Sequence, residues 1–249
     1  MDAGTGALLA GAGFGAGAVN AVAGGGSLVS FPALLAAGYP SVAANVTNSV
    51  ALLAGYFGGS VAYRRELRGQ RERMRTLAPT VVLGAAAGSA LLLVSPAEVF
   101  EAIVPWLILA ACALLGLQPK AAQIAERHSS GASSGAALHL GLFGATVYGG
   151  YFGAGLGIVT LALLGVLLSD DIQRLNALKG LISLLVAVVS AVAFAFFGPV
   201  AWDAAAIVGV ACLAGGVAGV RVARRLSARL LRGVVIVFGV GVAIAMMAS

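Results

Sequence analysis

The fold of this chain is decided by one stretch, Ala10–Pro32, which reads "AGAGFGAGAVNAVAGGGSLVSFP". It lies within an uncharged apolar segment at residues 5–38, yet its middle is glycine, which helices tolerate least after proline. As one helix, the segment would measure about 50 Å. The hydrocarbon core of a bilayer is only about 30 Å thick. A single unbroken transmembrane helix therefore does not account for this stretch.

The composition indicates an integral membrane protein. Of the 249 residues, 60% are hydrophobic and 10% are charged, whereas a soluble domain carries about 25% charged residues. Apolar runs long enough to cross a bilayer recur along the chain and predict transmembrane helices. The net charge of +6 comes from basic residues in short loops, which is typical of cytoplasmic loops and does not indicate nucleic-acid binding. The N-terminus has no basic region, so no cleaved signal peptide is expected.

The chain contains eight apolar segments, at residues 5–38, 41–63, 77–94, 99–117, 136–168, 172–197, 204–222 and 232–248. Two of them, 5–38 and 136–168, are too long for one span. Each of these two has a glycine-rich middle, "AGGGS" in the first and "FGAGLG" in the second. Glycine allows positive φ and close backbone approach, so we predict that the chain turns back at these points.

The sequence repeats at an offset of 131 positions. Asn45 aligns with Asn176, and the pair Gly84 and Gly88 aligns with Gly215 and Gly219. Internal repeats are common in transporters. We therefore divide the chain into a first repeat at residues 1–120, a polar linker at 121–135 and a second repeat at 136–249.

The loop charges indicate that the repeats are inverted. Loop 64–75 is strongly basic, while its counterpart at 195–206 has no basic residue. Basic loops are expected in the cytoplasm. With the loops placed there, segment 5–38 enters the membrane from the outside and returns to it as a hairpin, and segment 136–168 does the same from the inside. Eight simple spans would instead put the basic loop 221–232 outside.

The predicted fold is an all-α polytopic membrane protein with two inverted repeats. Each repeat is a glycine-broken re-entrant or hairpin helix segment followed by three transmembrane helices. The sequence leaves open whether these segments are re-entrant or paired short spans.

Two opposed hairpins would bring their tips together near the membrane midplane. After each tip a short helix is expected to start, near Ser27 and near Ile158, and helix N-termini bind anions through free N–H groups and the helix dipole. Ser27 is a candidate N-cap. The alternative is that the glycines only permit close helix packing. We prefer the site interpretation for Gly24–Gly26 and the packing interpretation for Gly11, Gly13, Gly15 and Gly17.

Polar residues inside the spans suggest further ligands. Asn45 and Asn48 lie on one helical face, as do Asn176 and Lys179 at the equivalent positions. A charge inside a membrane is costly and indicates function, and a lysine beside two positive helix ends would need an anion. Alternatively, Lys179 extends to the interface, and the asparagines only make interhelical hydrogen bonds.

The remaining polar residues carry weaker signals. His139 could relay protons, although a helix contact is preferred, and Cys112 and Cys212 are expected as small buried residues rather than a disulfide or metal site. The sequence has no motif for intramembrane catalysis, so neither enzyme activity nor a cofactor or metal is expected. The acidic residues should be solvated at the membrane edges; these are Glu98, Glu101, Asp170, Asp171 and Asp203.

Residues 24–49, "GGGSLVSFPALLAAGYPSVAANVTNS", together with the degenerate second copy, resemble the sulfite exporter TauE/SafE family over essentially the whole chain. The resemblance implies movement of sulfite or small organosulfur anions across the cytoplasmic membrane. Asn48 faces Lys179 in the second copy, so the implied site is asymmetric. The residues onto which it carries function are Gly24, Gly25, Gly26, Ser27, Asn45, Asn48, Gly155, Gly157, Asn176 and Lys179.

The sequence thus predicts a secondary transporter in the cell inner membrane, an exporter or permease for a small sulfur-containing anion such as sulfite or an organosulfonate. The anion would bind between the two tips and cross by alternating access. The alternatives are an anion channel of the same architecture and a non-transporting membrane scaffold. Expected partners are the anion and the lipid bilayer, not nucleic acid. The sequence allows, without identifying, a coupling proton or ion and a homo-oligomer.

Overall fold

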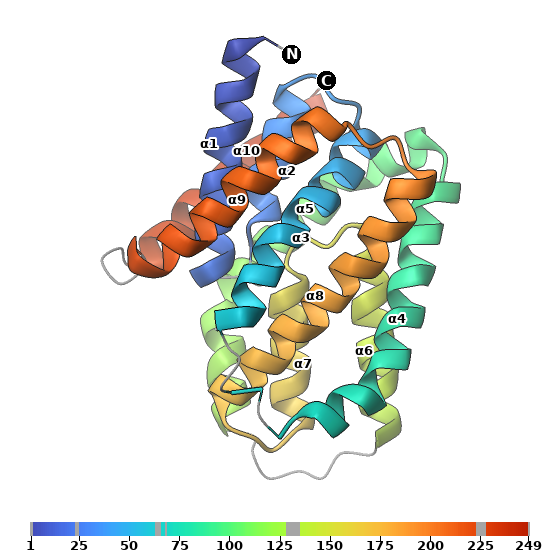
Figure 1. The fold of residues 1–249 in the computed structure, drawn as a ribbon, viewed down its shortest axis with the longest axis vertical. Coiled ribbons are helices and arrows are strands. Elements are labelled where there is room, and N and C mark those ends of the chain that lie inside the picture. Colours follow the sequence, from blue (N-terminus) through green and yellow to red (C-terminus); the bar gives the residue numbers. More distant parts are fainter. Residues whose placement is uncertain are drawn as a thin grey trace.

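The structure is a computed structural model that describes residues 2–22, 25–62, 66–67, 69–127, 135–222 and 228–248. The described chain is helical, as predicted (Figure 1). Its helices are α1 (Ala3–Val22), α2 (Ser27–Ala36), α3 (Ser41–Ala62), α4 (Arg71–Val94), α5 (Ala97–Arg127), α6 (Gly135–Tyr151), α7 (Leu156–Leu167), α8 (Ile172–Phe197), α9 (Trp202–Val222) and α10 (Ala228–Ala248).

The two long apolar segments each form two helices, α1 with α2 and α6 with α7, and every other segment forms one. The helices α2 and α7 have 10 and 12 residues, or about 15 and 18 Å, too short to cross a bilayer. Among the described residues, three helices are long and apolar enough to cross by themselves: α4, α5 up to Lys120, and α8.

Two boundaries differ from the prediction. Helix α4 already begins at Arg71, inside the predicted loop 64–75, and α5 continues to Arg127, inside the predicted linker 121–135. Both extensions are rich in arginine, glutamate, glutamine and alanine, which favour helix even when they are polar. Apolar segments mark where the membrane is crossed and not where a helix stops.

The helices connect at two ends of the molecule. At the basic end, Asp170 before α8 pairs with Arg73 at the start of α4. At the opposite end, the Ala201 N–H before α9 donates to Thr47 in the first half of α3, at 3.0 Å. The helices α3 and α8 are therefore antiparallel, as the inverted repeat requires of equivalent helices.

The two hairpins enter from opposite ends and meet in the middle (Figure 1). Helix α1 packs along α9, and α6 packs along α4, with His139 Nδ1 2.6 Å from Thr80 Oγ1 near the starts of the latter pair. Exchanging the two repeats maps one pairing onto the other. The inverted repeat and the re-entrant placement in a bilayer stay predictions, which this arrangement supports.

Glycines allow these pairings. A Cβ on Gly88 of α4 would overlap the Val147 carbonyl of α6, and one on Gly215 of α9 would overlap the Phe14 carbonyl of α1. Gly13 and Gly17 of α1 likewise touch the α9 backbone, which is the packing role predicted for them. Gly11 faces open space and Gly15 meets only Val29, so the packing prediction is wrong for Gly11 and weakly supported for Gly15.

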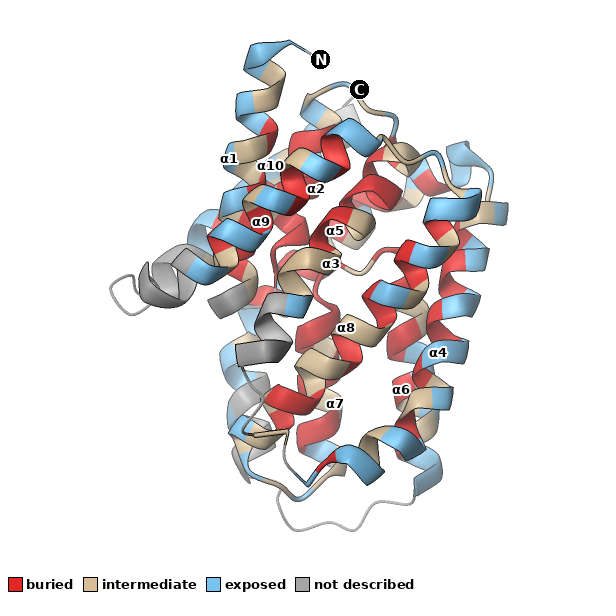
Figure 2. Cartoon of the chain, in the orientation of Figure 1, coloured by how far each residue is buried: buried red, intermediate tan, exposed pale blue. Residues whose placement is uncertain are grey.

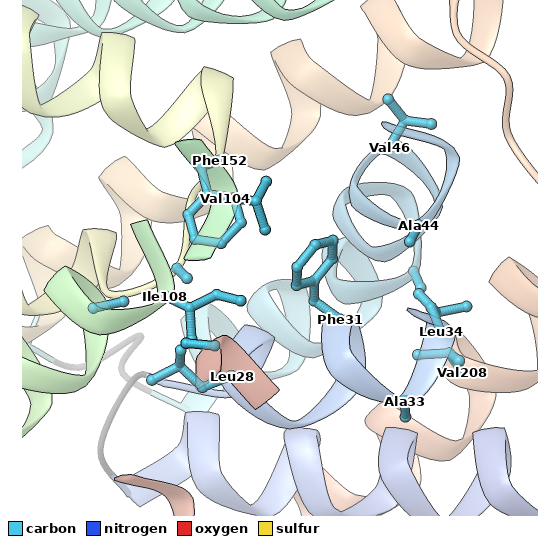
Figure 3. Close-up of a cluster of buried hydrophobic side chains, with 14 of the residues drawn as sticks. Leu28, Phe31, Ala33, Leu34, Ala44, Val46, Val104, Ile108, Phe152 and Val208 are labelled. Atoms are coloured by element: carbon cyan, nitrogen blue, oxygen red, sulfur yellow. The ribbon is translucent and has the colours of Figure 1, made fainter. Parts of the chain in front are cut away.

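Large apolar side chains cover the outside, for example Phe196, Phe197 and Trp106, which are exposed. Buried residues concentrate where the central helices meet (Figure 2). In the core, Phe31 of α2 packs edge-on against Phe152 at the tip of the second hairpin, with ring centroids 5.5 Å apart (Figure 3). An apolar exterior around a partly polar interior is what a bilayer demands.

Candidate functional site

The second hairpin tip turns through two glycines in the left-handed conformation. Gly153 has φ +78°, and Gly155, the N-cap of α7, has φ +80°. The predicted positive φ is therefore present at this tip. Helix α7 begins at Leu156, two residues before the predicted start at Ile158.

The first tip is built differently. Gly26 is the N-cap of α2 with φ −59°, and Ser27 is the first residue of that helix, so the predicted capping role of Ser27 is wrong. Glycine is needed here for close approach, because a Cβ on Gly26 would overlap the Ala16 carbonyl of α1. The Gly26 N–H donates to Asn20 Oδ1 at 2.8 Å. Gly24 lies outside the described residues.

A cavity of about 30 Å³ lies between the two tips. It borders the first residues of both short helices, Ser27 of α2 and Leu156 of α7. A cavity needs roughly 10–15 Å³ to hold one water, so this one holds about two. Its lining residues are Ser27, Ser49, Leu52, Tyr56, Gly149, Phe152, Gly153, Leu156, Ser183, Val186, Ala187 and Ser190.

The polar part of the cavity wall consists of hydroxyl groups. The Ser183 side chain is 3% exposed, and its Oγ has no hydrogen-bond partner among the described residues. Ser190 Oγ accepts from Ser89 at 3.0 Å, and Ser49 donates to the Asn45 carbonyl at 2.9 Å. None of the lining residues, all of them in the described chain, carries a charge.

Several carbonyl groups of the second tip already have donors. The Tyr148 hydroxyl donates to the Ala154 carbonyl at 2.5 Å, and Asn45 Nδ2 donates to the Tyr151 carbonyl at 2.9 Å. The Gly155 carbonyl accepts from two N–H groups of α7. The cavity therefore borders two positive helix N-termini, hydroxyl groups and the C-terminal end of α6, whose Tyr151 carbonyl is bonded by Asn45.

The asparagines of the first repeat hold helices together. Asn45 fastens α3 to the second tip, and Asn48 Oδ1 accepts from Ser30 of α2 at 2.5 Å. Both are buried, and neither lines the cavity. Both thus make the interhelical hydrogen bonds that the sequence offered as an alternative to ligation, and their role as ligands stays a prediction.

The pair Asn176 and Lys179 also lies outside the cavity wall. Lys179 Nζ donates to Asn176 Oδ1 at 3.1 Å, and the lysine is half-buried. Lys179 precedes Ser183 by one helical turn on the same face of α8, about 6 Å toward the basic end. It is therefore placed beside the cavity and not in it.

The sequence prediction and the cavity overlap in Ser27. Gly25, Gly26, Gly155 and Gly157 are buried and build the tips, but they do not line the cavity. Six of the lining residues that the sequence reasoning missed have a detectable signal, since they recur at helical spacing on α3 and α8. They are Ser49, Leu52 and Tyr56, and Ser183, Val186 and Ser190.

At the basic end, Asp170 is not solvated as predicted. Its carboxylate accepts from Arg73 at 2.6 Å and Arg174 at 2.8 Å, and its side chain is 14% exposed. Gln70 adds a hydrogen bond from Nε2 to the Arg174 carbonyl at 2.9 Å. Burial alone would raise the pKa of Asp170, but the hydrogen bonds from Arg73 and the Asp171 N–H and the arginine charges lower it below its usual value.

The fold defines a multi-pass helical membrane protein with a small cavity between α3, α8 and the two hairpin tips. Residues 9–246 match the family described as sulfite exporter TauE/SafE, and the chain belongs to this family.

Two relatives carry transporter names. A Sinorhizobium protein, "probable membrane transporter protein ORF9", is 30% identical over 250 residues, which cover 98% of this chain and 92% of that protein. A "probable membrane transporter protein" of Haemophilus influenzae is 26% identical over 226 residues, which cover 88% of this chain and 84% of that protein. No solved structure gives a significant match. The chain is accordingly a multi-pass membrane transporter.

Proposed function

We propose that the chain is a secondary transporter of the cell inner membrane for a small sulfur-containing anion, which binds in the cavity between the hairpin tips. The observation that carries the proposal is that α2 and α7, one from each half of the chain, both begin at this cavity. The carbonyls nearby are taken by Tyr148, Asn45 and the α7 backbone. Such a site attracts negative charge and not cations.

Transport by alternating access fits the size of the cavity. It holds about two waters, whereas sulfite has four heavy atoms and an alkanesulfonate has more. The tips must separate to admit the anion, and their separation toward one end or the other would open the site to one side of the membrane at a time.

Lys179 acts on the approach to the site. It lies one helical turn from Ser183 toward the basic end, which the distribution of basic residues assigns to the cytoplasm. An ammonium group at this depth attracts anions into the passage between cavity and cytoplasm. Asn176 holds it in place through Oδ1.

The proposal is tested with purified protein in liposomes, by measuring uptake and counterflow of sulfite and methanesulfonate. The chain has two lysines, of which Lys120 is exposed in the polar C-terminal part of α5 and serves as the matched control. We expect saturable flux that falls at least tenfold with Lys179→Gln and is unchanged with Lys120→Gln. Equal flux in both variants would remove Lys179 from the mechanism.

The same preparation separates the alternatives. Stepwise single-channel currents without counterflow would identify an anion channel. Absence of flux and binding for every sulfur anion tested would favour a non-transporting scaffold and refute the proposal.

A further inference from the structure

We infer that the cavity selects monovalent over divalent sulfur oxyanions, so that its ligand is a short alkanesulfonate or hydrogensulfite and not sulfate or the sulfite dianion. The inference rests on the proposed function and adds the charge state of the ligand. It follows from the charge that the cavity wall can supply.

The wall supplies at most about one positive charge. A helix N-terminus is equivalent to roughly half an elementary charge, so the two helices that begin at the cavity can together match one negative charge. Helix α6 ends at Tyr151 beside the cavity, and its negative end reduces this positive charge further. The described lining residues add none. Lys179 is a turn away and is engaged with Asn176. Asn20 Oδ1 further reduces the positive end of α2 by accepting the Gly26 N–H.

A second observation points to a ligand independently of the helix ends. Ser183 Oγ is buried at the cavity wall without a partner among the described residues. A buried hydroxyl without a partner is unfavourable, and an anion oxygen in the cavity would accept its hydrogen bond. Ser27 of α2 also lines the cavity and carries a hydroxyl group.

The rest of the wall is apolar. Leu52, Phe152, Leu156 and Val186 provide no hydrogen-bonding side chain. The second charge of sulfate would therefore be buried without compensation, which is strongly unfavourable. Once the tips separate to admit methanesulfonate, its methyl group would instead lie against these side chains.

Methanesulfonate and sulfate make a direct test, because both are tetrahedral at sulfur and keep a fixed charge across neutral and mildly alkaline pH. We expect titration calorimetry on the purified full chain to give at least tenfold tighter binding for methanesulfonate. Sulfite, titrated on either side of the ionisation of hydrogensulfite, should bind tighter on the acidic side.

The site is located with Ser183→Ala, and Ser95→Ala at the α4–α5 connection is the control. Loss of one hydrogen bond should weaken methanesulfonate binding by roughly three- to tenfold in the first variant and leave it unchanged in the second. Unchanged affinity in Ser183→Ala would show that the anion does not bind in the cavity and would overturn the inference.

The two proposals fail differently. Sulfate binding as tightly as methanesulfonate, or sulfite binding tighter on the alkaline side, would overturn the charge selection while leaving an anion transporter. If no sulfur anion binds or crosses the membrane, the proposed function itself is wrong.

Discussion

Replacing Asp170 by asparagine should destabilise the protein by about 1–2 kcal/mol at neutral pH. The carboxylate accepts charge-assisted hydrogen bonds from Arg73 and Arg174 at 2.6 and 2.8 Å. Buried bonds of this type contribute about 1.5–3 kcal/mol each. The two arginine side chains are 33% and 38% exposed, so solvent screening reduces each to about 0.5–1 kcal/mol. For a chain of this size the loss corresponds to a fall in melting temperature of roughly 2–8 °C.

The pKa of Asp170 determines how the stability difference between wild type and Asp170→Asn depends on pH. The pKa of Asp170 is lower in the folded protein than the unfolded value of about 3.9. Its stabilisation is therefore complete above the unfolded pKa and is lost as the pH falls through the lower folded value. The melting curves of wild type and Asp170→Asn, recorded in detergent, should differ at neutral pH and converge below about pH 4.

A control and a double-mutant cycle isolate the ion pair. Glu101→Gln removes an exposed carboxylate of α5 and should leave the melting temperature unchanged. Combining Asp170→Asn with Arg73→Gln should cost less than the sum of the two single changes, because they remove the same interaction. Additive effects, or a difference between wild type and Asp170→Asn that persists unchanged in acid, would refute the reasoning.

Three further substitutions test the packing of the tips by the same melting assay. Asn45→Ala leaves the Tyr151 carbonyl without its amide donor and should cost about 1–3 kcal/mol; unchanged melting would mean that this hydrogen bond is immaterial. Gly155→Ala has space for the methyl group but places alanine at φ +80°, a cost of about 1–2 kcal/mol, so wild-type stability would argue against this turn. Gly88→Ala places a methyl group against the α6 backbone and should cost about 1–3 kcal/mol of stability. Gly144→Ala meets open space and should be neutral or stabilising. A larger loss of stability in Gly144→Ala than in Gly88→Ala would contradict the packing of α4 on α6.

The architecture was predictable because the thickness and apolarity of the bilayer constrain the length and composition of the segments that cross it. Apolar length and glycine position separated the two hairpins from single spans, and the structure breaks both segments at those glycines. The helix ends were less predictable. Polar but helix-favouring residues carry α4 and α5 beyond the apolar segments, into Arg71 and Arg127, and hydropathy does not register such extensions.

The lining of the cavity was predicted less well than the fold, for a reason that Asn45 and Ser183 illustrate. Sequence reasoning ranks residues by how unusual they are in an apolar span, so it selects amides and charges. In the structure, the Asn45 amide donates its hydrogen bond to the Tyr151 carbonyl at the end of α6. The cavity-lining group without a hydrogen-bond partner among the described residues is the hydroxyl of Ser183. Serine is frequent in such spans, and only the packing of α3 against α8 distinguishes one that faces a cavity.

We expect that the two halves of the sequence do not move as rigid bodies. Helix α1 is seated against α9 through Gly13 and Gly17, and α6 against α4 through Gly88, so each hairpin is fixed to a helix of the other half. Rocking residues 1–120 against residues 136–249 would separate these backbone contacts. The helices in each pair are too close for one to slide along the other without loss of packing. The contacts around the two tips are of another kind. Phe31 and Phe152 form one edge-on aromatic pair between the tips, Asn45 of α3 makes one hydrogen bond to the second tip, and a small cavity separates them. Movement that opens the site should therefore carry α1 together with α9 and α6 together with α4, and should part the molecule at the tips.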